Sequence, residues 1–283
     1  MSRARVLVAG LVQVLVGWGA VMGSAAAYRF LLHPPIVSAL ALGDTATTIT
    51  RRMGVFVVVV AAYWAFGHWY ERRPVRDLQV DWRWLLAGGV AGALSIAATI
   101  ALLSATGHYH VKAVRGLGQA GDVLGLIWVA AVVEELTFRG LLLRICEERL
   151  GTRWALALTA LVFSLAHFAN NGFKPMTVVA VTLTGLMWSG VYLASRSLWV
   201  AAAHHCCWNA TIFLSGLPLS GQEEWRALAP LVTDYSGAVL WSGGAFGPED
   251  SLVSVIVTAG VSIALWRSAR AADATFPRPA MPA

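Results

Sequence analysis

Three charged side chains lie close together within an apolar stretch of the chain. Glu134, Glu135 and Arg139 fall inside a run that begins near residue 120 and ends near residue 146. In the middle of a membrane helix, each charge costs about 2.5 to 3.5 kcal/mol, so these groups must be paired or face a wet cavity. Glu135 and Arg139 are four residues apart and can form an ion pair along a helix, whereas Glu134 points about 100° away. The spacing therefore leaves Glu134 as the carboxylate that is free for chemistry.

Two later apolar stretches carry imidazole and amide groups. His167 lies in the first of them, and the second contains the doublet His204 and His205, followed by Asn209. His205 and Asn209 are four residues apart and share a helix face, so we expect His205 to be the inward member of the doublet. A single histidine in a membrane helix is often only a packing residue. One acid, two imidazoles and one amide in neighbouring stretches indicate a site instead.

The elements that must position these groups are membrane helices. The chain has 283 residues, of which 58% are hydrophobic and 13% are charged, which excludes an ordinary soluble domain. A bilayer core about 30 Å thick requires about 20 apolar residues per helix. This ruler predicts an all-α, polytopic membrane helix bundle with about eight transmembrane helices, near 6–28, 53–69, 84–105, 120–146, 154–170, 176–195, 197–215 and 252–267.

The rest of the composition indicates one integral membrane domain over residues 1–283. The Lys and Arg residues of the short loops favour both termini in the cytoplasm, and the 30–52 segment, with its break at Pro34 and Pro35, is expected outside together with the 216–251 loop. A cleaved signal peptide is the alternative for the first span. Three cysteines define no disulfide framework, and the scattered basic residues indicate no nucleic-acid partner.

The order of the three motifs resembles a known family. Glu-Glu-x-x-x-Arg at 134–139, Phe-x-x-x-His at 163–167 and His-x-x-x-Asn at 205–209 are similar to the motifs of the CPBP (CAAX protease and bacteriocin-processing, or Abi) intramembrane proteases. The resemblance covers about 120–215, the expected catalytic core. It implies peptidase activity, with members that include prenyl-protein endopeptidases, peptide-maturation proteases and immunity proteins. The positions that it carries over as active-site residues are Glu134, Glu135, Arg139, His167, His205 and Asn209.

Peptide hydrolysis needs an activated water and stabilisation of the oxyanion. We expect Glu134 to act as the general base, with His167 orienting the water. His205 and Asn209 would donate hydrogen bonds to the oxyanion. Glu135 and Arg139 would form an ion pair that holds Glu134 in place without contacting the substrate.

Two His and one Glu also match a catalytic zinc set, with Glu134, His167 and His205 as ligands. Since this would use the only free base, we favour catalysis without a cofactor and keep zinc as the alternative. The expected partners are a peptide or lipid-modified protein substrate and membrane lipid. A non-catalytic binding or immunity protein of the same fold is one alternative function, and a proton-coupled transporter is another, although no internal repeat is visible.

Overall fold

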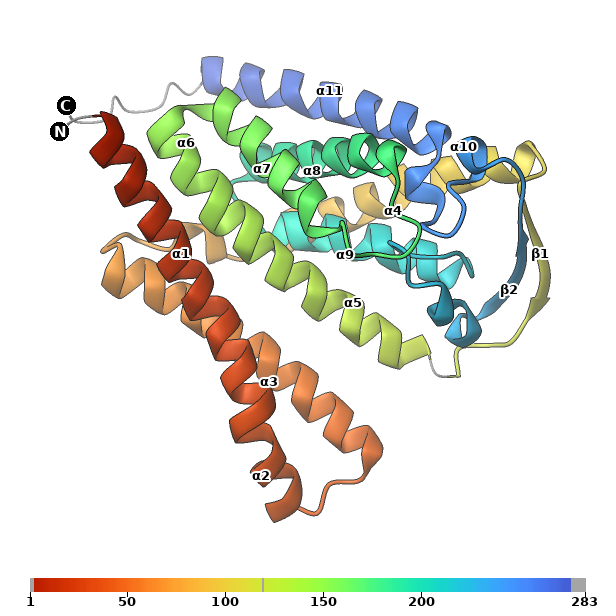
Figure 1. The fold of residues 1–283 in the computed structure, drawn as a ribbon, viewed down its shortest axis with the longest axis horizontal. Coiled ribbons are helices and arrows are strands. Elements are labelled where there is room, and N and C mark those ends of the chain that lie inside the picture. The colour runs from red at the N-terminus through yellow and green to blue at the C-terminus, as the bar shows by residue number, and fades with distance from the viewer. Residues whose placement is uncertain (1–2, 119, 276–283) are drawn as a thin grey trace.

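A computed structural model describes residues 3–118 and 120–275, and most of these residues are helical (Figure 1). The α-helices are α1 (Arg3–Ala27), α2 (His33–Ala39), α3 (Asp44–Ala65), α4 (Trp82–Ala105), α5 (Ala120–Glu135), α6 (Arg144–Leu150), α7 (Thr152–Ala166), α8 (Pro175–Ser195), α9 (Leu198–Leu214), α10 (Val239–Ser242) and α11 (Leu252–Thr275). Three π-helical segments, Tyr28–Leu32, Phe66–Tyr70 and Leu136–Leu143, and three 3₁₀ turns, Arg76–Leu78, Glu223–Leu228 and Pro248–Asp250, complete the helical part.

The predicted all-α helix bundle is confirmed, and each of the eight predicted spans overlaps a helical stretch, although α7 ends before the predicted limit at 170. Four described helical stretches are long and apolar enough to cross a membrane: Ala4–Ala39, Asp44–Tyr70, Trp82–Ala105 and Pro175–Ser195. The stretch from α5 to α6 is long enough but carries the charges of the candidate site. The number of passes and the orientation of the termini stay predictions.

The expected break at Pro34 and Pro35 is wrong, because the helix continues to Ala39. The N–H of His33 bonds to the carbonyl of Tyr28, five residues earlier, which closes a π-helical turn. The two prolines then occupy the first turn of α2, where a missing N–H removes little. The wider turn and the prolines together allow α1 and α2 to form one long rod (Figure 1).

A small sheet closes one end of the bundle and was not predicted. Strand β1 (Tyr109–Val114) pairs antiparallel with β2 (Leu231–Tyr235), with Tyr109 opposite Tyr235 and a register shift between Val111 and Ala113. The two strands join the loop after α4 to the 216–251 loop (Figure 1). The 216–251 loop is therefore structured and tied to the bundle.

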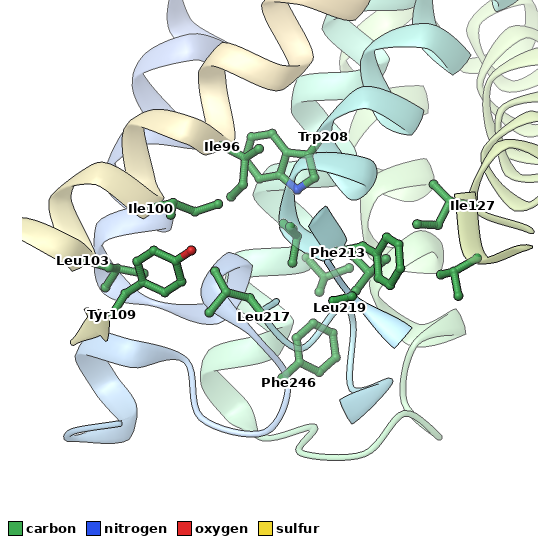
Figure 2. Packing of buried hydrophobic residues seen from close by; sticks show 14 of the residues in the cluster. Ile96, Ile100, Leu103, Tyr109, Ile127, Trp208, Phe213, Leu217, Leu219 and Phe246 are labelled. Carbon is green, nitrogen blue, oxygen red and sulfur yellow. The ribbon is translucent and has the colours of Figure 1, made fainter. Parts of the chain in front are cut away.

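Helix α9 is the central helix of the site region, and it packs against α4, α5 and α8. Two glycines of α4 allow α4 and α9 to approach closely. A Cβ at Gly92 would lie 2.1 Å from the carbonyl oxygen of His204, and a Cβ at Gly88 would lie 2.9 Å from the carbonyl oxygen of Val200. Apolar side chains from several elements then fill the space around it. In Figure 2, Ile96 of α4 and Phe213 of α9 lie in the cluster that also contains Trp208 and Phe246.

Candidate active site

The Glu135–Arg139 ion pair indicated by the spacing is present and fully buried. Arg139 Nη1 lies 3.0 Å from Glu135 Oε1, and both side chains are at most 1% exposed. Arg139 Nη2 also donates to the carbonyl of Gly185 on α8, at 2.9 Å. The guanidinium lies over the rings of Phe163 and Trp188, with its carbon 4.8 and 5.7 Å from their centroids. The pair therefore ties α5 and the π-helical segment after it to α7 and α8.

The helix changes its hydrogen bonding immediately after the two glutamates. Helix α5 ends at Glu135, and the π-helical segment Leu136–Leu143 follows. The carbonyl of Gly140 in this segment accepts hydrogen bonds from Tyr63 Oη, at 3.2 Å, and from Arg144 Nε, at 2.9 Å. A Cβ at position 140 would lie 2.7 Å from the Tyr63 ring, so the approach requires glycine. π-Helical turns often occur at functional sites, and this one begins directly after the two glutamates.

His205 is fixed by its contacts with Glu135 and Trp188. Its Nδ1 lies 2.9 Å from Glu135 Oε1, and its ring stacks on Trp188 with 3.6 Å between centroids. Because Glu135 is a carboxylate paired with Arg139, it accepts, and Nδ1 of His205 carries the proton. His205 Nε2 is then left 3.9 Å from Glu134 Oε2.

Glu134 differs from its neighbour in its surroundings. Its side chain is 31% exposed and lines a cavity of about 290 Å³. The side chain of Glu135 is only 1% exposed and does not line this cavity. Glu134 Oε2 is itself buried and has no hydrogen-bond partner. Glu134 is thus the acid of this segment that opens to the cavity, in the orientation that the helical spacing predicts.

His167 and Asn209 line the same cavity. Helix α7 ends at Ala166, so His167 is the residue that caps it and lies outside the helix, where we had predicted a span to 170. His167 Nδ1 is 2.9 Å from the carbonyl of Phe163, which only accepts, so Nδ1 donates and Nε2 has no protein hydrogen bond. Asn209 Oδ1 is buried without a hydrogen-bond partner. The structure thereby brings Glu134, His167, His205 and Asn209 to one cavity.

His204 is buried too, which the helix-face argument did not predict. Its Nδ1 accepts a hydrogen bond from the indole Nε1 of Trp188, at 3.1 Å. The doublet therefore holds Trp188 from two sides, since His205 stacks on its ring and His204 binds its edge. Sequence analysis missed Trp188, because an apolar aromatic in an apolar helix gives no signal for this role.

Glu249 is a second residue that sequence analysis missed. It lies in the turn Pro248–Asp250 before α11 and lines the cavity of Glu134 and His167. Ser220 Oγ donates to its Oε1 at 2.6 Å. Only its place in an acidic loop is visible in the sequence, and that is typical of a solvated surface.

A zinc ion bound by Glu134, His167 and His205 was the alternative to a site without cofactor. Both imidazoles keep Nε2 free of protein hydrogen bonds, as metal ligands do. Among the residues that the structure describes, however, no three His, Cys, Asp or Glu side chains converge as a metal-binding group. The side chains as placed are not gathered as a ligand set, and catalysis without a cofactor stays a prediction, with zinc at Glu134, His167 and His205 as its alternative.

Comparison with known proteins adds the family. Residues 116–211 match the model of the family described as type II CAAX prenyl endopeptidase Rce1-like. We call this stretch the Rce1-like domain because of its similarity to that family. The match confirms the family resemblance, and the Rce1-like domain contains all six predicted site residues, whereas Glu249 lies outside it. No curated protein and no solved structure matches the chain. The apolar helices and the family together indicate a membrane protein and support membrane endopeptidase activity at the level of the family.

Proposed function

We propose that this protein is an intramembrane endopeptidase that hydrolyses a peptide bond of a membrane-associated or lipid-modified peptide or protein. The observation that carries the proposal is the single cavity that gathers Glu134, His167, His205 and Asn209 from three helical elements. These groups supply a base, an orienting imidazole and hydrogen-bond donors, which are the parts that amide hydrolysis requires.

Glu134 is the proposed general base. Its side chain is 31% exposed and lines the cavity, so a water molecule there can donate a proton to it. Glu135 does not fit this role, because its side chain is only 1% exposed, it does not line the cavity, and its Oε1 already accepts from Arg139 and His205. His167 offers Nε2 to the same water, since its Nδ1–H is committed to Phe163.

The oxyanion of the tetrahedral intermediate is assigned to Asn209 and His205. The Asn209 amide supplies N–H donors. His205 donates from Nε2 only as an imidazolium, because Nδ1 already carries the proton given to Glu135. Two carboxylates face His205, with Glu135 Oε1 2.9 Å from Nδ1 and Glu134 Oε2 3.9 Å from Nε2.

The proposed substrate class follows from the walls of the cavity. Apolar side chains of α5 and α8, including Leu126, Ala130 and Val181, line it beside the acids. The cavity-lining residues include no Lys or Arg. A hydrophobic segment that arrives from the bilayer fits these walls better than a polar soluble peptide does. We therefore expect soluble casein to be cut poorly.

The test uses Glu134→Gln, which keeps the shape and removes the base. We expect the variant, purified and reconstituted in lipid vesicles, to lose peptidase activity and to melt like the wild type. Glu148→Gln on α6, which changes a side chain 44% exposed, is the matched control and should retain activity. Wild-type turnover by Glu134→Gln would remove Glu134 from the mechanism.

The same variant tests the substrate class in cells. Peptide fragments missing both from a strain without the protein and from a strain with Glu134→Gln should come from membrane-attached proteins. If those fragments came only from freely soluble proteins, access from the bilayer would be the wrong picture.

A further inference from the structure

Glu249 is a buried acid at the cavity that the proposed mechanism does not use. It belongs to the turn Pro248–Asp250, which comes after the Rce1-like domain, and its side chain lines the cavity together with Glu134. The residue is only 6% exposed. An acid in such a position needs a reason, because burying a carboxyl group costs free energy unless it is paired.

The residues next to Glu249 hold the turn in which it lies. The next residue, Asp250, is fully buried and bonds to Lys174 Nζ and to Thr177 Oγ1 at the start of α8. Gly247, just before the turn, has a φ of +121°, and a Cβ there would lie 2.2 Å from the carbonyl oxygen of Pro218. Asp250 and Gly247 therefore hold the turn on both sides of Glu249, whose carboxyl group accepts a hydrogen bond from Ser220.

Glu249 also lacks the partner that a structural acid would have. Within the described part of the chain it forms no salt bridge, since the nearby Lys174 pairs with Asp250. Its hydrogen bond comes from a neutral hydroxyl, that of Ser220. Because no Lys or Arg pairs with it in the described residues, burial disfavours the charged form of this side chain.

The electrostatics of the turn agree with this. Burial raises the pKa of Glu249, while the hydrogen bonds of Ser220, the charge of His167 and the indole of Trp208 oppose the rise. Tyr235 of β2 and Asp250 are titratable groups close to Glu249. Burial raises the pKa of Asp250 as well. Glu134 has a different environment, because it is more exposed and lies beside His205. Two carboxyl groups with such different surroundings are typical of an acid and base pair.

We propose that Glu249 is the general acid of this site and protonates the leaving amine; this inference rests on the proposed peptidase function. In the first step, Glu134 takes a proton from water while the water oxygen bonds to the carbonyl carbon. In the second, the C–N bond breaks, its electron pair stays on nitrogen, and the nitrogen takes the proton of Glu249. The proton on Glu134 then passes through cavity water to Glu249, and the product acid loses its proton to solvent, which restores both residues.

The test compares two leaving groups on the same acyl peptide. An amide needs a proton on nitrogen to break, whereas a nitrophenyl ester releases a stable phenolate without one. Since general acids contribute about 10²- to 10⁴-fold, Glu249→Gln should cut the amide at least about 100-fold more slowly. It should cut the ester less than about 10-fold more slowly. Glu134→Gln should lose both activities, because both reactions need the attacking water.

The adjacent acid provides the matched control. Asp250→Asn weakens the contact with Lys174, so it should lower the melting temperature and reduce amide and ester cleavage by the same factor. If Glu249→Gln slowed amide and ester cleavage by the same factor, or cut the amide at the wild-type rate, the role of Glu249 would be overturned. A wild-type protein that cleaves neither substrate would instead refute the proposed peptidase function.

Discussion

Replacing Glu135 with Ala tests whether the buried ion pair holds the site together. Glu135 Oε1 accepts from Arg139 Nη1 at 3.0 Å and from His205 Nδ1 at 2.9 Å. The substitution removes both acceptors at once. Arg139 keeps the carbonyl of Gly185, but its charge is then unpaired in a site without water access, since the side chain is fully buried.

The magnitude follows from these two losses. An unpaired buried charge costs about 3 to 5 kcal/mol. The orphaned N–H of His205 adds about 1 to 3 kcal/mol. The total of about 4 to 8 kcal/mol is a large part of the roughly 5 to 15 kcal/mol that stabilises a typical protein. At about 2 °C per kcal/mol for a chain of this size, the melting temperature should fall by at least about 8 °C.

The assay is thermal unfolding in detergent, monitored through the fluorescence of the thirteen tryptophans. Glu148→Ala is the control, because Glu148 also forms an i,i+4 pair, with Arg144, at the same 3.0 Å, but with a side chain 44% exposed. Arg144 keeps Glu71, so this variant should lose no more than about 1 kcal/mol.

A double variant separates the charge from the packing. Adding Arg139→Met to Glu135→Ala removes the unpaired charge, so it should cost less stability than adding Arg139→Met to the wild type. If Glu135→Ala melted within about 4 °C of the wild type, or if the two substitutions were additive, the ion pair would not support the site as argued.

Two further predictions concern the cofactor and the helix contact. Elemental analysis of active protein should find no stoichiometric zinc, and chelator treatment should leave activity unchanged; one zinc per chain, lost together with activity, would make Glu134, His167 and His205 ligands. Gly92→Ala should destabilise the protein by about 1 to 3 kcal/mol in the same melting assay, because its Cβ would meet the backbone of α9, whereas Gly19→Ala meets nothing within 4 Å and should be neutral. Equal melting temperatures for the two glycine variants would contradict the close packing of α4 and α9.

Local spacing predicted the part of the site that lies along single helices. The contact of Glu135 with Arg139 and the turn of Glu134 away from it follow from four-residue spacing, which a single helix sets by itself. The same argument chose His205 as the inward histidine. It did not predict that His204 is buried, because α9 is covered on several sides and burial there depends on where α4 and α8 pack.

Contacts between distant segments could not be predicted in this way. Strand β1 is exposed at five of its six positions, so its burial does not alternate, and it is held in place by its pairing with β2. Glu249 stands in a loop, where no period relates it to the motifs, and it reaches the cavity because Asp250 is bound at the start of α8. Such placements depend on tertiary structure and leave no mark on local composition.

The bond between Asp250 and Lys174 has a consequence for protein engineering. Lys174 lies within the Rce1-like domain and Asp250 lies after it, so one wall of the cavity comes from chain that the family match does not cover. A chimera that transplanted only residues 116–211 into another membrane scaffold would carry the motifs but lack that wall. The transferable unit extends at least to the first turn of α11, and the loop before it must travel with the motifs.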